Sequence, residues 1–240
     1  MTRLVWAHFK AEVLGAIRVP GFVIPTMVFP SMFFLLFAVP YLKTWPAANQ
    51  TTASFMAFAV FGVIFFQYAV GAAEERQNPW YAYLRTLPLP PLVRPLAQVL
   101  AGLLLALTAA LVVAATAWAT TPLRPGAASP LGLLAALALG AVPLGLLGLA
   151  VAYLFPPRAA LPVANLLYLP LSYLGGLWMP PEALPAWAQK ASLWTPTRHW
   201  AELLWASARG EAWPPASLAA LSAYALIFAA LAAWAWRRER

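Results

Sequence analysis

Long apolar runs separated by short polar segments dominate the pattern along this chain of 240 residues. Six runs are each long enough to cross the roughly 30 Å hydrocarbon layer of a bilayer at about 1.5 Å per helical residue. A helix satisfies its backbone hydrogen bonds within one segment, as a crossing of lipid requires. The pattern predicts an all-α integral membrane protein whose six transmembrane helices span about 21–42, 52–73, 95–119, 131–155, 160–179 and 214–236.

The residues before the first run form a different kind of segment. Within 3–18 the apolar residues fall on one arc of a helical wheel, and Arg3, Lys10 and Arg18 lie beside that arc. This arrangement predicts an amphipathic interfacial helix over 1–20. Pro20-Gly21 is a natural break before the first span, although a charged leader continuous with that span is the alternative.

The segment 180–213 is too polar to cross a bilayer yet carries five tryptophans, which favour the headgroup layer. Thr195 before Pro196 is typical of a helix start, and Gly210 suits the position after a helix end. We therefore expect a helix over about 196–209, and a second one could precede it between 181 and 194. Both are expected to lie on, or dip into, the outer leaflet.

Prolines and small residues inside the runs indicate where helices bend or meet. A proline within a span frees a carbonyl, so the five internal prolines predict kinks. Small residues four apart allow close helix approach. The positions are Pro25, Pro30, Pro143, Pro162 and Pro170 for the kinks, and Ala136 with Gly140 and Ala141 with Gly145 for the approach.

Composition supports a single membrane domain over 1–240. Hydrophobic residues make up 63% of the chain and charged residues 9%, against about 25% charged in an ordinary soluble domain. The net charge of +8 could suggest nucleic acid, but the basic residues lie in short clusters at the ends of apolar runs. The absence of cysteine excludes disulfides, thiol catalysis and cysteine-ligated metal.

The basic residues also predict an orientation. With the N-terminus inside, ten basic residues fall in cytoplasmic segments and five on the other side. This bias predicts a multi-pass protein of the plasma or inner membrane with both termini in the cytoplasm. The ten are Arg3, Lys10, Arg18, Arg76, Arg85, Arg94, Arg158, Arg237, Arg238 and Arg240, and the five are Lys43, Arg124, Lys190, Arg198 and Arg209.

Signals of catalytic chemistry are scarce in this sequence. No Gly-x-x-x-x-Gly-Lys-Ser/Thr loop is present, so energy from ATP would have to come from another subunit. All acidic residues lie in segments assigned to loops, interfaces or ends, which argues against an ion-coupled carrier. His8 and His199 fall on opposite sides of the predicted membrane, which argues against an intramembrane protease. We expect no catalytic residue, no metal site and no directly bound cofactor.

The segment 74–90, between the second and third runs, combines both signs of charge with three aromatic residues and a proline stop. This composition suits a short helix presented to a partner. The alternative is an interfacial loop whose side chains merely reach the headgroups.

Three stretches, in this order, resemble a known family. They are Phe9-Lys10-Ala11-Glu12 through Arg18-Val19-Pro20, then Glu75-Arg76 to Leu84-Arg85-Thr86-Leu87-Pro88-Leu89, then Leu174-Gly175-Gly176 to Pro185-Ala186-Trp187 followed by Thr195-Pro196-Thr197-Arg198-His199. The chain resembles the permease subunits of ATP-binding-cassette exporters of the type-2 class over nearly its whole length. It departs from the family pattern at Asn78-Pro79, where a glycine is usual, and at Gly175-Gly176, where Ser-Gly is commoner.

The resemblance implies that two permease subunits pair, as a homodimer or heterodimer, and bind separately encoded ATPase subunits that hold ATP and Mg. It implies an export path for an amphipathic, lipid-like or drug-like substrate. The implied coupling residues are Glu74, Glu75, Arg76, Tyr81, Tyr83, Leu84 and Arg85, and the implied outer-side gate consists of Gly175, Gly176, Pro180, Trp187 and Pro196. A non-transport membrane assembly or regulatory subunit is the alternative function, followed by an enzyme acting within the bilayer.

Overall fold

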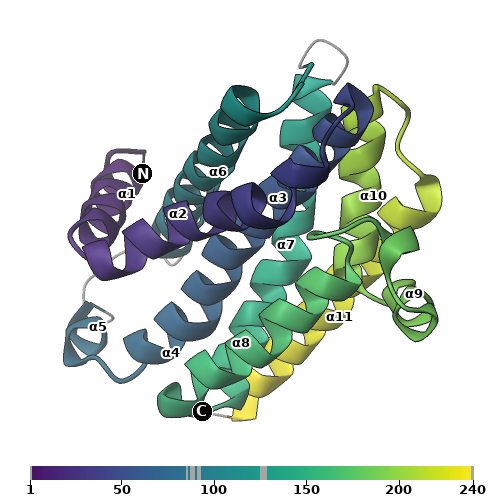
Figure 1. The fold of residues 1–240 in the computed structure, drawn as a ribbon. Helices are drawn as coiled ribbons and strands as arrows, with labels where there is room; N and C mark the ends of the chain where they lie inside the picture. Colours follow the sequence, from purple (N-terminus) through teal and green to yellow (C-terminus); the bar gives the residue numbers. More distant parts are fainter. Residues whose placement is uncertain (1, 85, 87–89, 91–92, 125–128, 239–240) are drawn as a thin grey trace.

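A computed structural model describes residues 2–84, 86, 90, 93–124 and 129–238, apart from the side chains of residues 20, 22, 81, 82 and 84. Across these residues the regular structure is helical and no strand occurs, which confirms the all-α class (Figure 1). The helices are α1 (Thr2–Ile17), α2 (Pro20–Phe37), α3 (Trp45–Phe66), α4 (Ala72–Glu75), α5 (Pro79–Leu84), α6 (Val93–Thr120), α7 (Pro130–Leu154), α8 (Pro157–Leu174), α9 (Ala186–Ser192), α10 (Pro196–Arg209) and α11 (Pro215–Arg238).

Five stretches of helix are long and apolar enough to cross a membrane. They are Val23–Tyr41, Trp45–Glu75, Val93–Thr120, Pro130–Leu154 and Pro215–Arg238. The sixth expected span, 160–179, corresponds to α8, which begins earlier and ends at Leu174. Arg158 and Asn165 make α8 less apolar than the other five. Its crossing, and so the count of six, stays a prediction.

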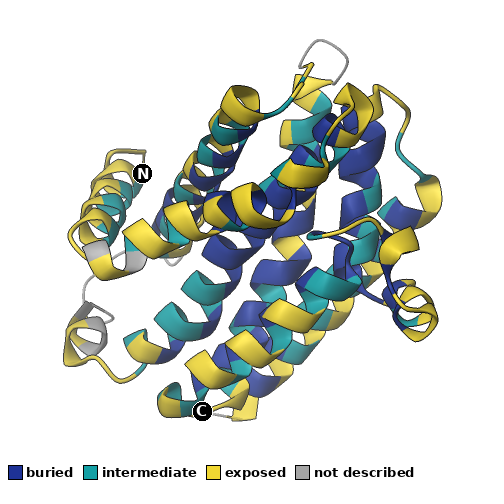
Figure 2. Cartoon of the chain, in the orientation of Figure 1, coloured by how far each residue is buried: buried dark blue, intermediate teal, exposed yellow. Residues whose placement is uncertain are grey.

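The helices pack around two central elements, α3 and α7. Helix α3 contacts α2, α6, α7, α8 and α10, while α7 also contacts α10 and α11, and α1 lies against α6. Figure 2 shows buried residues concentrated on α3, α7 and α10, with α1 and much of α2 and α11 exposed. Exposed apolar side chains on the outer helices are expected in lipid, because there the surrounding solvent is as apolar as the side chains.

The start of the second expected span also differs, since α3 begins at Trp45 rather than near residue 52. Asn49, a polar residue in its first turns, is buried. Its amide donates to the carbonyl oxygen of Arg124 and accepts from the backbone nitrogen of Arg124, both at 3.0 Å. This reciprocal pair satisfies the side chain, so the helix can extend through a polar sequence. Helix α3, the π-helical stretch Gln67–Gly71 and α4 follow one another without a break from Trp45 to Glu75, and we call this continuous helix the α3–α4 rod.

The bounds predicted for the late helix are confirmed. Helix α10 begins at Pro196, where the hydroxyl of Thr195 accepts from the backbone nitrogen of Arg198 at 3.3 Å. It ends at Arg209, because Gly210 adopts the left-handed conformation with φ of 71° that glycine tolerates best. The helix expected before it is shorter than 181–194 and covers only Ala186–Ser192.

Helix α10 packs inside the bundle rather than on its surface, and its expected position in the outer leaflet stays a prediction. Ten of its fourteen residues are buried, and it packs against α3, α7, α8 and α11. Trp200 is fully buried, and its indole nitrogen donates to the carbonyl oxygen of Ala136 at 2.7 Å. The indole of Trp205 donates to the hydroxyl of Ser54 at 2.7 Å. Because both indole donors have partners inside the bundle, these tryptophans do not need the wet headgroup layer.

Candidate functional site

The predicted coupling segment lies at the end of the α3–α4 rod, where α5 stands at the edge of the bundle (Figure 1). The side-chain oxygen of Asn78 accepts from the backbone nitrogen of Trp80 at 3.0 Å, and Pro79 is the first helical residue. An asparagine cap followed by proline is a favoured helix start. The pair that departs from the family's glycine therefore begins a capped short helix here.

Two exposed aromatic side chains mark the outward surface of α5. Trp80 is 58% exposed and Tyr83 is 54% exposed, and their ring centroids are 5.4 Å apart. Trp80 was not among the residues expected from the sequence, although its spacing of three from Tyr83 on a helix would have indicated a shared face. Glu74 is also exposed. The expected contacts of the Tyr81 and Leu84 side chains, and of Arg85, lie outside the described residues.

Glu75 and Arg76 differ from the aromatic pair because their side chains engage the bundle itself. One carboxylate oxygen of Glu75 accepts from the side-chain amide of Gln98 at 2.7 Å, and the other lies 3.7 Å from the guanidinium of Arg94. Arg76 donates to the carbonyl oxygen of Ala152, and its guanidinium lies 5.5 Å from the ring centroid of Tyr153. Two neighbouring residues thus connect the base of α5 to two different helices, α6 and α7.

Helix α1 reaches the cluster formed by Glu75, Arg94 and Gln98 through its residue Glu12. Burial and the nearby carboxylate of Glu75 raise the pKa of Glu12 above its ordinary value, although Arg94 and Gln98 oppose that change. Gln67, in the π-helical stretch, donates to the backbone oxygen of Gln98 at 3.2 Å. Polar residues in otherwise apolar helices are a signal of such clusters, and Gln67 and Gln98 carry it in the sequence.

The residues expected at the outer gate lie mostly together where α8 ends against α10. Gly175 and Pro196 are buried there, and a Cβ on Gly175 would lie 2.5 Å from Thr197. The Thr197 hydroxyl donates to the carbonyl oxygen of Leu171 at 2.6 Å. Gly176 has φ of 73°, which favours glycine. The double glycine therefore permits a close approach that a serine would obstruct at the first position.

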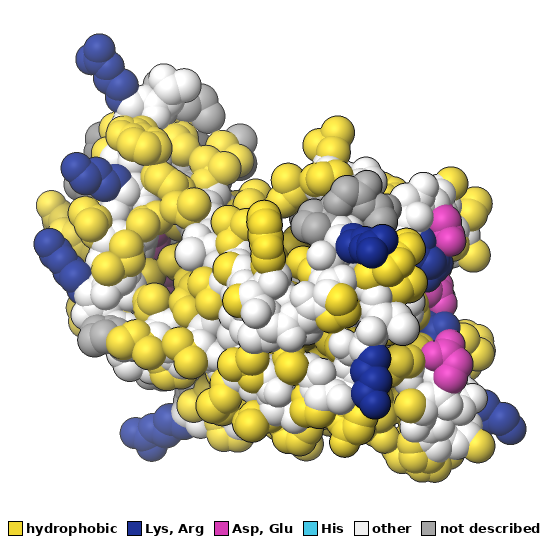
Figure 3. Space-filling view, turned by 45° about the horizontal axis from the view of Figure 1, so that its top comes forward, with side chains coloured by type: hydrophobic (Ala, Val, Ile, Leu, Met, Phe, Trp, Pro, Cys, Tyr) yellow, Lys and Arg dark blue, Asp and Glu magenta, His cyan; other side chains and the backbone are white. Residues whose placement is uncertain are grey.

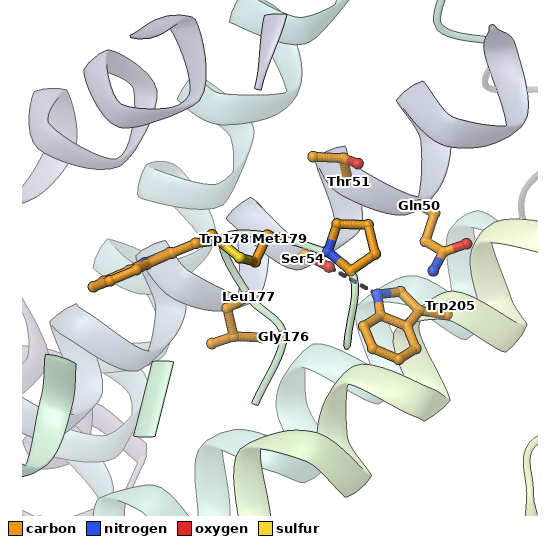
Figure 4. Close-up of a pocket in the computed structure, with 9 residues that line it drawn as sticks. Gln50, Thr51, Ser54, Gly176, Leu177, Trp178, Met179 and Trp205 are labelled. Carbon is orange, nitrogen blue, oxygen red and sulfur yellow. Dashed lines mark hydrogen bonds between the residues drawn. The ribbon is translucent and has the colours of Figure 1, made fainter. Parts of the chain in front are cut away.

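The other two expected gate residues, Pro180 and Trp187, differ in where they lie. Figure 4 shows the turn after Gly176 passing Trp205, whose indole reaches Ser54 on α3. Pro180 lines a cavity between this turn and the start of α3. Trp187 is 66% exposed on α9 and is not among the residues that line the cavity. The structure thus brings four of the five expected gate residues to one region and leaves Trp187 at the surface.

The side chains of the described residues offer little chemistry beyond binding and positioning. No three histidine, cysteine, aspartate or glutamate side chains in that part of the chain gather as a possible metal site. His8 lies on α1 and His199 on α10. The two organised regions, at opposite ends of the α3–α4 rod, can hold helices together and contact a partner.

The structure is thus an apolar helical bundle of the integral membrane class, with a short exposed helix connected to two of its longer helices. The chain belongs to the ABC-2 type transporter family, whose sequence model matches residues 3–207. It is 26% identical over 241 residues to a protein of Bacillus subtilis (strain 168) named "Putative transport permease YvfS", with 95% of each chain covered. The protein is therefore a multi-pass permease subunit of a transporter, and its family implies an ATP-binding-cassette ATPase as partner.

Proposed function

We propose that this chain is the permease subunit of an ATP-driven exporter for an amphipathic, lipid-like or drug-like substrate. Two permease subunits, identical or different, would enclose the path, and ATP and Mg would be held by the ATPase subunits rather than by this chain. The observation that carries the proposal is the double connection of α5, through Glu75 to α6 and through Arg76 to α7. A partner that displaces α5 would displace both helices.

The contacts at the base of α5 are suited to transmitting force. Glu75 is joined to α6 by a charge-assisted hydrogen bond of 2.7 Å, which is stronger than a neutral one. Arg76 is joined to the carboxyl-terminal turns of α7 through a backbone carbonyl, so its partner cannot change rotamer. The exposed pair Trp80 and Tyr83 then supplies an apolar surface for the ATPase. Aromatic residues of this kind are enriched among the anchors of protein interfaces.

Truncation of Trp80 or Tyr83 to alanine should weaken binding of the ATPase subunit. The loss is expected to be about 1–2 kcal/mol for each residue if it is buried in the interface. The measurement is co-purification of the tagged permease with its ATPase, followed by titration of the complex in detergent. Trp194→Ala is the matched control, because Trp194 is an exposed tryptophan (81%) that lies just before α10.

The same complexes, reconstituted in vesicles, test export itself. ATP supplied on the side of the ATPase should drive a fluorescent amphiphile across the membrane and away from that side. Accumulation in the opposite direction would exclude export. Equal ATPase binding by wild type, Trp80→Ala and Tyr83→Ala would show that α5 is not the docking helix.

The cytoplasmic position of α5 has its own test, made simple by the absence of native cysteine. Gln77→Cys should react with an impermeant thiol reagent only from the cytoplasmic side, whereas Thr44→Cys and Ala212→Cys should react only from outside. All three residues are exposed. Labelling of Gln77→Cys from outside in intact cells would reverse the orientation and remove α5 from the reach of a cytoplasmic ATPase.

A further inference from the structure

A cavity of about 540 Å³ lies between the first turns of α3, the turn at 180–182 and one side of α10. The cavity lies at the end of the α3–α4 rod opposite to Glu75, and it is therefore distant from the candidate coupling segment. Ala47, Pro180 and Trp205 give it apolar walls. Its size falls within the range of small-molecule sites, which is about 300–1,000 Å³.

The charged side chains that line this cavity are of both signs. Arg198 and Arg209 line it together with Glu182 and Glu202. Figure 3 shows acidic and basic side chains gathered along the edge of the molecule that carries α9 and α10. Because each cation is also close to a carboxylate, Arg198 to Glu202 and Arg209 to Glu211, the site has no strong positive field for a lone anion. It is complementary to a molecule that carries both charges.

These charged groups are held in defined positions. The Nε of Arg198 donates to Glu202 at 2.8 Å, and its guanidinium lies 5.2 Å from the ring centroid of Trp205. Burial alone would raise the pKa of Glu202, but hydrogen bonds from Ser217 and Arg198 outweigh it and keep that pKa below its ordinary value. The Glu202 carboxylate therefore stays ionised at neutral pH. Arg209 is held at the rim by Glu211, with a separation of 2.7 Å.

Other polar side chains at the cavity have no partner in the described part of the protein. The Gln50 amide and the Thr51 hydroxyl make no hydrogen bond there, and the Glu182 carboxylate makes no ion pair. Figure 4 shows Gln50 beside Trp205, with Thr51 on the same stretch of α3. These donors and acceptors can serve a ligand without breaking an existing contact.

The surroundings indicate an amphiphile rather than a small soluble zwitterion. Leu193 and Trp194, between α9 and α10, are 56% and 81% exposed, and exposed tryptophans favour the headgroup layer of a membrane. A ligand that placed its polar end in the cavity could lay its apolar part along such side chains.

We propose that this cavity binds the zwitterionic headgroup of an amphiphile, with its phosphate near Arg198 and Arg209 and its ammonium near Glu182. The headgroup can belong to a lipid of the bilayer or to the exported cargo, since the chemistry is the same. Only the assignment to exported cargo rests on the proposed export function. In that case the headgroup would be recognised at the exit of the path.

The test compares three lipids with identical acyl chains: phosphatidylethanolamine, phosphatidylglycerol and uncharged diacylglycerol. Binding to the purified full chain in detergent is measured by native mass spectrometry, without the ATPase. Wild type should prefer phosphatidylethanolamine to diacylglycerol by about tenfold or more, as expected from at least one charge-assisted contact. Equal binding of all three lipids would overturn the proposal.

Two variants assign the two ends of the headgroup. Arg209→Gln should weaken both phospholipids by about tenfold relative to diacylglycerol, whereas Glu182→Gln should lower only the preference for the ammonium-bearing lipid. Lys190→Gln is the matched control, because it removes one exposed basic charge from α9 without touching the cavity. An effect of Lys190→Gln as large as that of Arg209→Gln would also overturn the proposal.

Addition of the ATPase and ATP separates the two sources. Loss of the bound phospholipid during hydrolysis would assign the headgroup to cargo, and retention would assign it to a bilayer lipid. Because headgroup selectivity is measured without the ATPase, it can hold even if export fails. Conversely, a transporting complex whose permease shows no headgroup selectivity would refute the cavity proposal alone.

Discussion

Replacement of Gly140 by alanine should destabilise the bundle severely, although it adds only one methyl group. A Cβ at this position would lie 2.2 Å from two atoms of the Trp200 ring, which is fully buried. The ring cannot move freely, because its nitrogen donates to the Ala136 carbonyl at 2.7 Å. Overpacking of a core typically costs about 1–3 kcal/mol, and we expect the upper end or more. Thermal unfolding in detergent measures it.

Helix propensity alone would make Gly140→Ala stabilising, so a loss of stability can be attributed to the clash with Trp200. Alanine is favoured over glycine in a helix by about 1 kcal/mol, so Gly71→Ala, where nothing lies within 4 Å of the added Cβ, should be neutral or stabilising. Combining Gly140→Ala with Trp200→Phe should cost less than the sum of the two changes, because they share one contact. Additive losses would show that the clash is not the cause.

Reversal of charge at Glu75 should uncouple ATP hydrolysis from transport while leaving the ATPase bound. Glu75→Arg would remove the acceptor of Gln98 and place a cation beside Arg94, so that α5 loses its connection to α6. Transport per ATP hydrolysed should fall by about 5- to 150-fold, the range that corresponds to a coupling free energy of about 1–3 kcal/mol. Both rates are measured on the same reconstituted vesicles.

Glu74→Arg is the matched control for this experiment. It makes the same change of charge one residue earlier, on an exposed side chain for which the described structure shows no ion pair. We expect it to alter affinity for the ATPase but not the transport obtained per ATP. An unchanged ratio in Glu75→Arg, or an equal fall in both variants, would refute the role of Glu75 as the connection between α5 and α6.

The helix α10 shows how far local sequence signals reach and where they stop. Thr195, Pro196 and Gly210 predicted its two ends, because capping depends on residues within one turn. Its burial was not predictable in the same way, since its tryptophans suit either a headgroup layer or a core that offers hydrogen-bond acceptors. The acceptors, Ala136 and Ser54, lie 64 and 151 residues away along the chain.

In the candidate site, too, some features followed from local sequence and others from contacts between distant residues. The mixed charge of 74–90 singled out the candidate coupling segment, and the small residues Ala136 and Gly140, four positions apart, predicted a place of close approach. What fills that place is the indole of Trp200, rather than the backbone of a neighbouring span. The partners of Glu75 and Arg76 likewise came from the fold, since Gln98 and Ala152 are 23 and 76 residues distant.

Membrane residence, the helical class and the two ends of α10 were encoded in local hydrophobicity, caps and prolines, which act over a few residues. The inward position of α10, the anchoring of α5 and the cavity beside Arg198 depended on packing between distant segments. Hydrophobicity could not distinguish these arrangements, because a side chain that faces lipid and one that faces the protein interior are equally apolar. Steric fit and hydrogen-bond pairing make that choice, and both require the helices to be in place.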